Sequence, residues 1–519
     1  MRKQVRLFLL LQVLSAVTVW AQSDAPDPAI IQKIREEGLQ HSQVMDIAHH
    51  LTDESGPRLT NSPGFMKAAQ WAVAEMKSWG MKSNLEAWGD FGPGWELQRS
   101  YIAMKVPYYH PIIAHPFAWT KGTNGMVTAD VVFLQSLSEE AISKYKGSFQ
   151  GKVVLAGVTD TVLRSAFDAY ANRYTDKELD SLKDSDMFTE EMLNGMIGYF
   201  NGIRAAMRHL QKLGCVAVLN ARTYNRDGTI DVAQWYTGKK DELLDLLTFE
   251  VGTEDYLSMQ RLLERGKKVQ IELEVKSRMI PENTKAYNVI GEIPGTDPTL
   301  KSELVMLGGH LDSWHSGTGA TDNAAGCAVM MEAARILHAL NLQPKRTIRV
   351  ALWSGEEQGL LGSHAYVTKH FGDPVTMKLL PEQSKVSVYY NLDNGTGKIR
   401  GIYLQNNEAV RPIFQQWLQP FNDLGATAIT SSNTGATDHL SFDAVGIPGF
   451  QFVQDPMEYE TRTHHTNMDD YDHLSPDDLK QASTIIAAFV YLSSVRAEKI
   501  PRKPLPDPGP WLFDSFKLK

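Results

Sequence analysis

The chain has 519 residues, of which 43% are hydrophobic and 22% charged, and its formal net charge is -9. This length is enough for about two to four domains with a large buried core. The mildly acidic balance and the absence of a basic cluster argue against nucleic acid as a partner.

The N-terminus has the pattern of a secretory signal peptide. A basic start (MRKQVR) precedes an apolar run (LFLLLQVLSAVTVW) that ends at Ala21-Gln22, which predicts cleavage near Ala21 and a signal peptide over residues 1–21. A membrane anchor is the alternative, but the apolar run is short for a bilayer span. No later stretch is long and apolar enough to cross a membrane, so we expect a periplasmic or secreted protein without stable membrane association.

Residues 22–121 are expected to form the first part of an α/β domain. A polar helix is predicted from Asp24 to about Ile47, and Ser62-Pro63 predicts the start of a second helix that ends at Gly80. The cysteines Cys215 and Cys327 both lie in apolar runs, which favours buried free thiols over a disulfide.

Residues 122–280 are predicted to be an inserted β-rich domain, because short β-rich runs alternate there with helices. The charged stretch between Thr159 and Gly198 is most simply a solvated surface. The α/β pattern returns over residues 281–498, where Ser475-Pro476 predicts a helix that starts with a capping box. The Pro-rich residues 499–519 are expected to be an extended tail.

Four strand-like runs in the second part of the α/β domain each lead into acidic or histidine residues. The runs are LVML, TIRVALW, VSVYYNL and GFQFV. Ligands of open α/β sheets bind beyond the carboxyl ends of the strands, so a functional site is expected where these runs end. The candidate residues are His310, Asp312, Asp322, Glu356, Glu357, Asp393, His464 and His465.

These residue types suit a centre of two zinc ions. Zinc is bound by imidazole and carboxylate groups, and two neighbouring ions need a bridging carboxylate. The carboxylates Asp322, Glu357 and Asp393, with one bridging hydroxide, would balance the four positive charges. His310 and His465 would complete the centre as neutral ligands, and its near-neutrality suits a partly buried position.

Two further carboxylates have a predicted role beside the metal. Asp312 suits an acceptor that fixes the imidazole tautomer of His310. Glu356 precedes a ligand, so we expect Glu357 on the metal and Glu356 as the general base that takes a proton from water. The residues therefore predict metal-assisted hydrolysis. The structural alternatives are a helix cap at Asp322, a solvated pair at Glu356 and Glu357, and a turn at Asp393.

The order of the motifs H-x-D, T-D-N-x-A-G, E-E, L-D and H-T-x-x-D resembles metallopeptidase family twenty-eight, the co-catalytic zinc exopeptidases. Gly-Pro-Arg-Leu at 56–59 and Asn-Val-Ile-Gly at 288–291 extend the resemblance over nearly the whole chain outside the insert. The resemblance implies a zinc-peptidase-like (phosphorylase-like) α/β fold, which is a three-layer αβα sandwich with a mostly parallel mixed sheet. It also implies that the insert is a protease-associated domain.

The resemblance further implies how the residues share two zinc ions. His310 and Asp393 would bind one ion, Glu357 and His465 the other, and Asp322 would bridge them. Glu356 would be the general base. His464 would either donate to the carbonyl oxygen in the transition state or have a structural role.

The function implied is hydrolysis of peptide bonds at a chain end, most simply by an aminopeptidase acting on peptides. A dipeptidase of the carboxypeptidase Q type is the alternative, since the sequence does not show which terminus is recognised. Glutaminyl cyclases usually lack the insert and use one zinc. Receptor-like relatives have lost their ligands, and here all five are present. Dimers occur in the family, so a homodimer is compatible with this reading.

Overall fold

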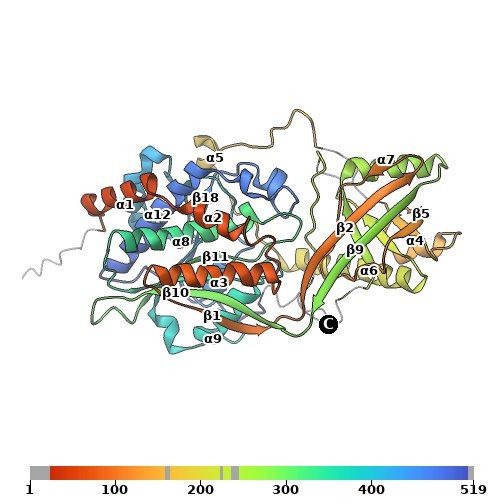
Figure 1. Ribbon diagram of the computed structural model, residues 1–519. Helices are drawn as coiled ribbons and strands as arrows, with labels where there is room; N and C mark the ends of the chain where they lie inside the picture. The colour runs from red at the N-terminus through yellow and green to blue at the C-terminus, as the bar shows by residue number, and fades with distance from the viewer. Residues whose placement is uncertain are drawn as a thin grey trace, which may run out of the picture.

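The computed structural model describes residues 24–157, 164–222, 226–234, 236, 243 and 245–511, so the predicted signal peptide lies outside the described residues. Two eight-stranded sheets form two units, an α/β unit on the left of Figure 1 and an inserted unit on the right. None of the described helices combines the length and the apolar character that a membrane span requires.

The sheet of the α/β unit has the strand order β1-β10-β12-β11-β15-β18-β16-β17. The four strands β12, β11, β15 and β18 are parallel neighbours, so their carboxyl ends meet at one edge of the sheet. The strands are β1 (Lys82–Asp90), β10 (Lys285–Ile293), β11 (Leu304–His310), β12 (Thr347–Trp353), β15 (Val386–Asn391), β16 (Ile399–Tyr403), β17 (Ala428–Thr430) and β18 (Gly449–Gln454).

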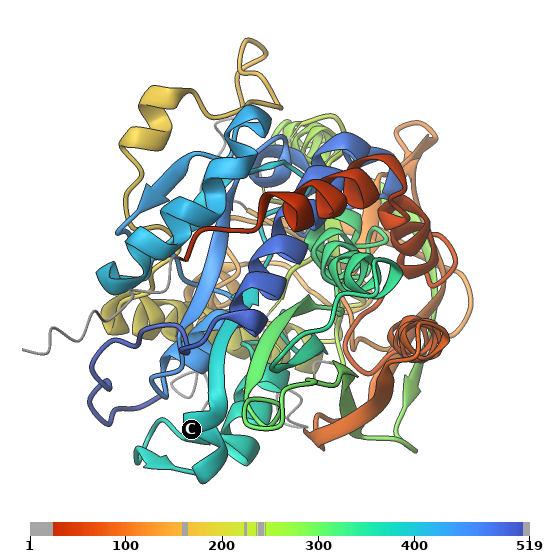
Figure 2. The same cartoon turned by 90° about the vertical axis from the view of Figure 1, so that its left-hand side faces the viewer.

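Helices cover both faces of this sheet, which confirms the predicted three-layer αβα sandwich with a mostly parallel mixed sheet. Figures 1 and 2 show the larger helical layer, with α1, α8 and α12, on one side and α9 on the other. The larger layer is α1 (Pro28–Gln40), α2 (Val44–Leu51), α3 (Pro63–Ser78), α8 (Ala325–Ala339), α10 (Arg411–Leu418) and α12 (Pro476–Val495); the smaller is α9 (Leu361–His370) and α11 (His439–Asp443).

The N-terminal helices differ from the prediction in one respect. The helix expected from Asp24 to Ile47 is two helices, α1 and α2, because contacts with α8 take the backbone groups between them. Gln43 N–H donates to Glu332 Oε1 at 3.0 Å, and Arg335 Nη2 donates to the His41 carbonyl at 3.3 Å. The next helix, α3, begins as predicted, with Ser62 Oγ accepting from the Phe65 N–H.

Helix α12 also begins where it was predicted, but the capping box is absent. Ser475 makes no hydrogen bond from its side chain to the helix, and its own N–H donates to Thr396 Oγ1 at 2.7 Å. The two cysteines, Cys215 and Cys327, are buried free thiols, as expected.

The inserted unit contains the second sheet, in the order β3-β2-β9-β5-β6-β7-β8-β4. The long strands β2 and β9 pair from Gly94 opposite Ile280 to Val106 opposite Gln270 and connect the two units (Figure 1). The sheet thus begins at Gly94, before the boundary expected at residue 122. Its strands are β2 (Gly94–Val106), β3 (His110–Pro111), β4 (Ala114–Pro116), β5 (Val127–Leu134), β6 (Val153–Ala156), β7 (Ala217–Asn220), β8 (Leu247–Val251) and β9 (Gln270–Ile280), with helices α4 (Glu139–Lys144), α6 (Glu190–Lys212) and α7 (Thr253–Glu264).

Residues 164–188, which we call the strap, pass from the inserted unit onto the α/β unit. The strap contains α5 (Asp176–Asp180), which lies over the α/β unit in Figure 1, and Leu179 of α5 is buried against Tyr403 and Val453. Most charged side chains of the strap are exposed, as expected for a solvated surface, but its apolar residue Leu179 packs on the α/β unit.

Candidate metal and catalytic site

Two histidines face the two oxygens of one carboxylate at the carboxyl edge of the parallel strands. His310 Nε2, at the end of β11, lies 3.1 Å from Asp322 Oδ1, and His465 Nε2, in the loop after β18, lies 3.2 Å from Asp322 Oδ2. A carboxylate that presents one oxygen to each of two ligand groups has the arrangement of a bridge between two ions.

Each histidine has a second carboxylate of its own. Asp393 Oδ1, two residues after the end of β15, is 3.1 Å from His310 Nε2, and Glu357 Oε2, in the loop after β12, is 3.0 Å from His465 Nε2. His310, Asp322 and Glu357 each have a donor atom close enough to the other two for the three residues to hold a metal ion. Asp322 Oδ2 and Glu357 Oε1 are also buried without a hydrogen-bond donor among the described residues, as expected for oxygens that bind a cation.

The loop before α8 holds Asp322 in place through a neighbouring carboxylate. Asp469 accepts from the Thr321 N–H at 2.6 Å, from Thr321 Oγ1 at 2.7 Å and from the Asp322 N–H at 3.1 Å. Asn323 Nδ2 donates to the Leu392 carbonyl at 2.9 Å, which ties this loop to the end of β15. Asp322 lies in non-helical backbone and gives α8 no side-chain cap, so the alternative of a simple helix cap is not what the structure has.

Asp312 acts differently from the prediction. His310 Nδ1 donates to the backbone carbonyl of Asp312 at 3.0 Å, whereas the Asp312 carboxylate is 3.8 Å away. The carboxylate instead accepts from Thr60 Oγ1 at 2.8 Å and from the backbone N–H groups of Glu356 and Glu357 at 3.4 and 3.3 Å. Asp312 therefore fixes the imidazole through its backbone and the loop after β12 through its side chain.

Glu356 and His464 border the centre at longer distances than the four residues around Asp322. Glu356 Oε2 is 3.9 Å from His310 Nε2, and His464 Nε2 is 3.8 Å from Asp322 Oδ2. Burial, followed by the charges of neighbouring carboxylates, raises the pKa of Glu356 well above its usual range, although His310 opposes this. Each side chain also belongs to a group of three that could hold a metal ion, Glu356 with His310 and Asp393, and His464 with Asp322 and His465.

Buried acids dominate the electrostatics of the centre. Burial raises the pKa of Glu357 to about 6, that of Asp469 to about 7 and that of Asp438 to about 8. A buried cation would favour the ionised carboxylates and reverse these shifts. The nearby guanidinium of Arg58 donates to backbone carbonyls, including that of Leu311 at 2.6 Å, so its hydrogen bonds are not directed at the carboxylates.

The inserted unit contacts the loop that carries His465. His465 has a left-handed backbone (φ 61°), and its carbonyl accepts from the Val232 N–H at 3.2 Å. Asn467 Oδ1 accepts from the Ile230 N–H at 2.7 Å, and Asp231 forms a β-bridge with Thr466. A segment of the insert thus supports the conformation of this ligand loop.

Tyr459 is a residue of the centre that the sequence did not reveal. It begins the short turn Tyr459–Thr463 that leads to His464, and its ring centroid lies 4.7 Å from that of His464. Burial, and then the charges of Asp322 and Asp393, raise its pKa well above the usual range of tyrosine. Tyr459 belongs to none of the recognised motifs, so no spacing signal could have indicated it.

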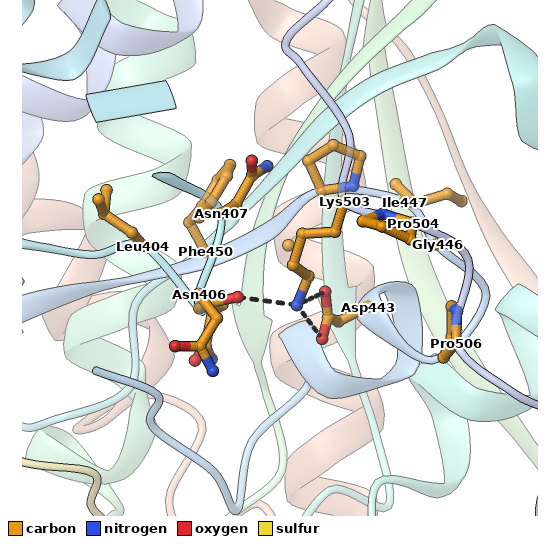
Figure 3. Close-up of a pocket in the computed structure, with 13 residues that line it drawn as sticks. Leu404, Asn406, Asn407, Asp443, Gly446, Ile447, Phe450, Lys503, Pro504 and Pro506 are labelled. Carbon is orange, nitrogen blue, oxygen red and sulfur yellow. Dashed lines mark hydrogen bonds and ion pairs between the residues drawn. The ribbon is translucent and has the colours of Figure 1, made fainter. Parts of the chain in front are cut away.

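A separate cavity of about 270 Å³ lies between the end of β16 and the C-terminal tail (Figure 3). Within it, Lys503 Nζ lies 2.9 Å from the Asp443 carboxylate and donates to the Gln405 carbonyl at 2.8 Å. None of the candidate residues lines this cavity.

Residues 288–490, which carry every candidate site residue, match peptidase family M28. Mouse carboxypeptidase Q is 26% identical over 456 residues, which are 87% of this chain and 86% of that protein. Residues 288–490 are thus a peptidase family M28 domain. Together with the carboxypeptidase and aminopeptidase relatives, this match identifies a metallo-exopeptidase, a hydrolase of peptide bonds.

Solved structures agree with this assignment. A peptidase M28 precursor from Shewanella amazonensis has a TM-score of 0.67 and 25% identity, with 92% of this chain and 98% of that chain covered. A zinc aminopeptidase from Bacillus subtilis has a TM-score of 0.56 at 19% identity, with 88% and 96% covered, and shares the fold of this M28 peptidase.

Proposed function

We propose that this M28 peptidase is a zinc-dependent aminopeptidase that hydrolyses the N-terminal bond of peptides with two zinc ions bound. The observation that carries the proposal is the pair of Asp322 oxygens, each of which faces a different histidine at 3.1 or 3.2 Å. The nitrogen and oxygen donors of the centre suit zinc. One ion would be held by His310, Asp322 and Asp393, and the other by Asp322, Glu357 and His465.

Zinc in such a centre polarises a carbonyl group and lowers the pKa of water. Glu356 takes a proton from the attacking water, holds it while the new carbon–oxygen bond forms, and gives it to the leaving amine as the carbon–nitrogen bond breaks. The Asp312 carboxylate holds the backbone of Glu356 and Glu357 through two N–H groups, which positions the base beside the ligand.

A dipeptidase is the second candidate. It is favoured by the similarity to carboxypeptidase Q, which extends over 87% of the chain. Three matched peptides separate the two activities: one free at both ends, one N-acetylated and one C-amidated, each tested with zinc on the protein expressed from Gln22. An aminopeptidase is stopped by N-acetylation alone, whereas a dipeptidase is stopped by either block.

The test of the mechanism is Glu356→Gln. Because glutamine cannot accept the proton, we expect kcat to fall by about 10²- to 10⁴-fold while the zinc content, measured by elemental analysis, is unchanged. The matched control is Glu382→Gln, which neutralises an exposed glutamate on the short helix Pro381–Lys385 and leaves kcat as in the wild type. Equal cleavage by Glu356→Gln and the wild type would rule out the proposed base.

We also propose that the protein is periplasmic or secreted, since the sequence predicts a signal peptide over residues 1–21. N-terminal sequencing of the exported protein tests this proposal, and a start near Gln22 is expected.

The inserted unit is proposed to be protease-associated-like, and its contacts with the His465 loop support a position beside the substrate. A homodimer is the proposed assembly, which light scattering of the purified protein tests.

A further inference from the structure

The loop that carries His465 is joined to the inserted unit by a short stretch of antiparallel pairing. The Val232 N–H donates to the His465 carbonyl at 3.2 Å, and the Asn467 N–H donates to the Ile230 carbonyl at 3.1 Å. A β-bridge between the two segments lies between these bonds. A segment of the insert is therefore paired directly with the backbone of a proposed zinc ligand.

The side chain of Asn467 adds two hydrogen bonds to this pairing. Its Oδ1 accepts from the Ile230 N–H at 2.7 Å, and its Nδ2 donates to the Gly228 carbonyl at 3.2 Å. Ile230 and Val232 are buried and belong to one apolar cluster with Trp314 of the α/β unit. The segment that Asn467 binds is thus itself fixed by core packing between the two units.

His465 needs such support, because its backbone lies in the left-handed region at φ 61°. A residue other than glycine adopts this region at a cost and keeps it only where the surrounding contacts fix it. In this conformation His465 Nε2 lies 3.2 Å from Asp322 Oδ2 and 3.0 Å from Glu357 Oε2. The position of the imidazole against both carboxylates therefore depends on the contacts that hold its backbone.

The other half of the centre is built by the α/β unit. His310 is the last residue of β11, which pairs with β12 on one side and β15 on the other. Asp393 follows β15 of the same sheet by two residues. The two proposed zinc sites thus differ in their support, since regular strands position His310 and Asp393, whereas a loop paired with the insert positions His465.

We propose that the inserted unit completes the zinc site of His465, and that Asn467 is the positioning residue through which it acts. The inference rests on the proposed function, because it assumes two bound zinc ions. Asn467 acts through the backbone of His465 and is not itself a ligand. Docking of the insert segment and binding of this ion are then coupled, so that each strengthens the other.

Asn467→Ala tests the proposal in the full mature chain, because alanine removes both side-chain hydrogen bonds. Competition with a chromophoric zinc chelator measures the two zinc affinities. We expect one affinity to fall by roughly 10- to 100-fold and the other to stay as in the wild type. At limiting zinc kcat should be low, and excess zinc should return it close to the wild-type value. A general structural role would weaken both ions together.

Two single-site backgrounds show which ion is affected. His310→Ala leaves the site of His465, and His465→Ala leaves the site of His310. Adding Asn467→Ala should weaken zinc binding in the first background and leave it unchanged in the second. Thermal melting with zinc checks that each variant is folded.

The matched control is Asn433→Ala, which also removes a contact between distant segments. Asn433 Nδ2 lies 3.4 Å from Asp184 Oδ1 of the strap, so this variant should bind both ions as the wild type does. A second variant lies in the insert. Asp231 accepts from the Ala233 N–H at 2.9 Å and forms an ion pair with Arg222. Asp231→Ala should therefore weaken the same ion as Asn467→Ala.

The role of Asn467 is overturned if Asn467→Ala keeps both wild-type zinc affinities, or if it weakens zinc equally in the two single-site backgrounds. The proposed function stands in either case, provided that the wild type holds two ions and cleaves the peptides. A wild type that holds fewer than two zinc ions, or that cleaves none of the peptides, overturns both proposals.

Discussion

Glu250 is a carboxylate that the fold buries away from the metal centre, on β8 of the inserted unit. It is 1% exposed, Asn220 Nδ2 donates to its Oε2 at 2.8 Å, and its Oε1 accepts no hydrogen bond from the described residues. Burial raises the pKa of Glu250 to about 7, although the charge of Arg222 opposes the shift. The folded protein therefore keeps this group protonated at a pH where the unfolded chain has already ionised it.

Glu250→Gln should stabilise the protein in a pH-dependent way. The pKa of Glu250 is 4.5 in the unfolded chain and about 7 in the folded protein. The wild type therefore loses about 3 kcal/mol of unfolding free energy as the pH rises between these two values. The variant loses none of it, so its advantage in melting temperature should be largest at pH 8 and vanish toward pH 4.5. Glu264→Gln, at the exposed end of α7, is the control. An advantage that does not change with pH would contradict the argument.

Sequence reasoning at the residue scale identified the side chains of the centre but not all of their contacts. The strand-end pattern was sufficient for the histidines and carboxylates around Asp322, because parallel strands bring their carboxyl ends together. It could not show that His310 bonds to the backbone of Asp312, since that depends on the path of a loop. Tyr459 was missed for the same reason, as its position follows from the packing of its loop against Gly395 and His464.

Among the helices and strands, the features that depend on neighbouring residues were predicted, and those that depend on contacts between distant segments were not. Helices α3 and α12 begin where proline and serine predicted them, since these signals act within one turn. The extent of the second sheet was not predictable, because β2 pairs with β9, which is remote in sequence. The middle of β2 is exposed, so its burial lacks the alternation that marks a strand.

The strap is an element whose role depends on such distant contacts, and Arg173 is its main polar anchor. Arg173 Nη1 is 2.8 Å from Asp455 Oδ2, and its Nη2 is 2.8 Å from Asp478 Oδ2. Ser185 pairs with Thr434 further along the strap. Asp455 precedes the turn Tyr459–Thr463, which leads to His464 and His465, so the strap braces this loop from outside.

Arg173→Met should loosen the strap. The arginine side chain is 43% exposed, so solvent screens its ion pairs and the loss is about 1 kcal/mol. Cleavage of residues 164–188 by proteinase K should then be roughly fivefold faster, because local opening is more frequent. Lys177→Met removes an exposed positive charge from the same strap and should leave the rate unchanged. Equal cleavage rates for both variants would show that Arg173 does not anchor the strap.

At the scale of the whole molecule, the centre joins segments that are far apart in sequence. Its proposed ligands come from the ends of β11, β12, β15 and β18 and from the loop before α8, and the inserted unit supports the loop of His465. The buried carboxylates repel one another unless cations are present. Bound metal should therefore stabilise the folded protein in addition to its role in the reaction.

Removal of zinc should lower the thermal stability of the protein. A ligand present at a thousandfold excess over its Kd stabilises a folded state by about 4 kcal/mol, so treatment with 1,10-phenanthroline should lower Tm by roughly 5–10 °C, and added zinc should restore it. Asp322→Asn is the matched variant, because it keeps the size of the side chain and removes the proposed bridge. Its Tm should respond little to either treatment. If the wild type melts at the same temperature with and without zinc, the metal does not hold these segments together.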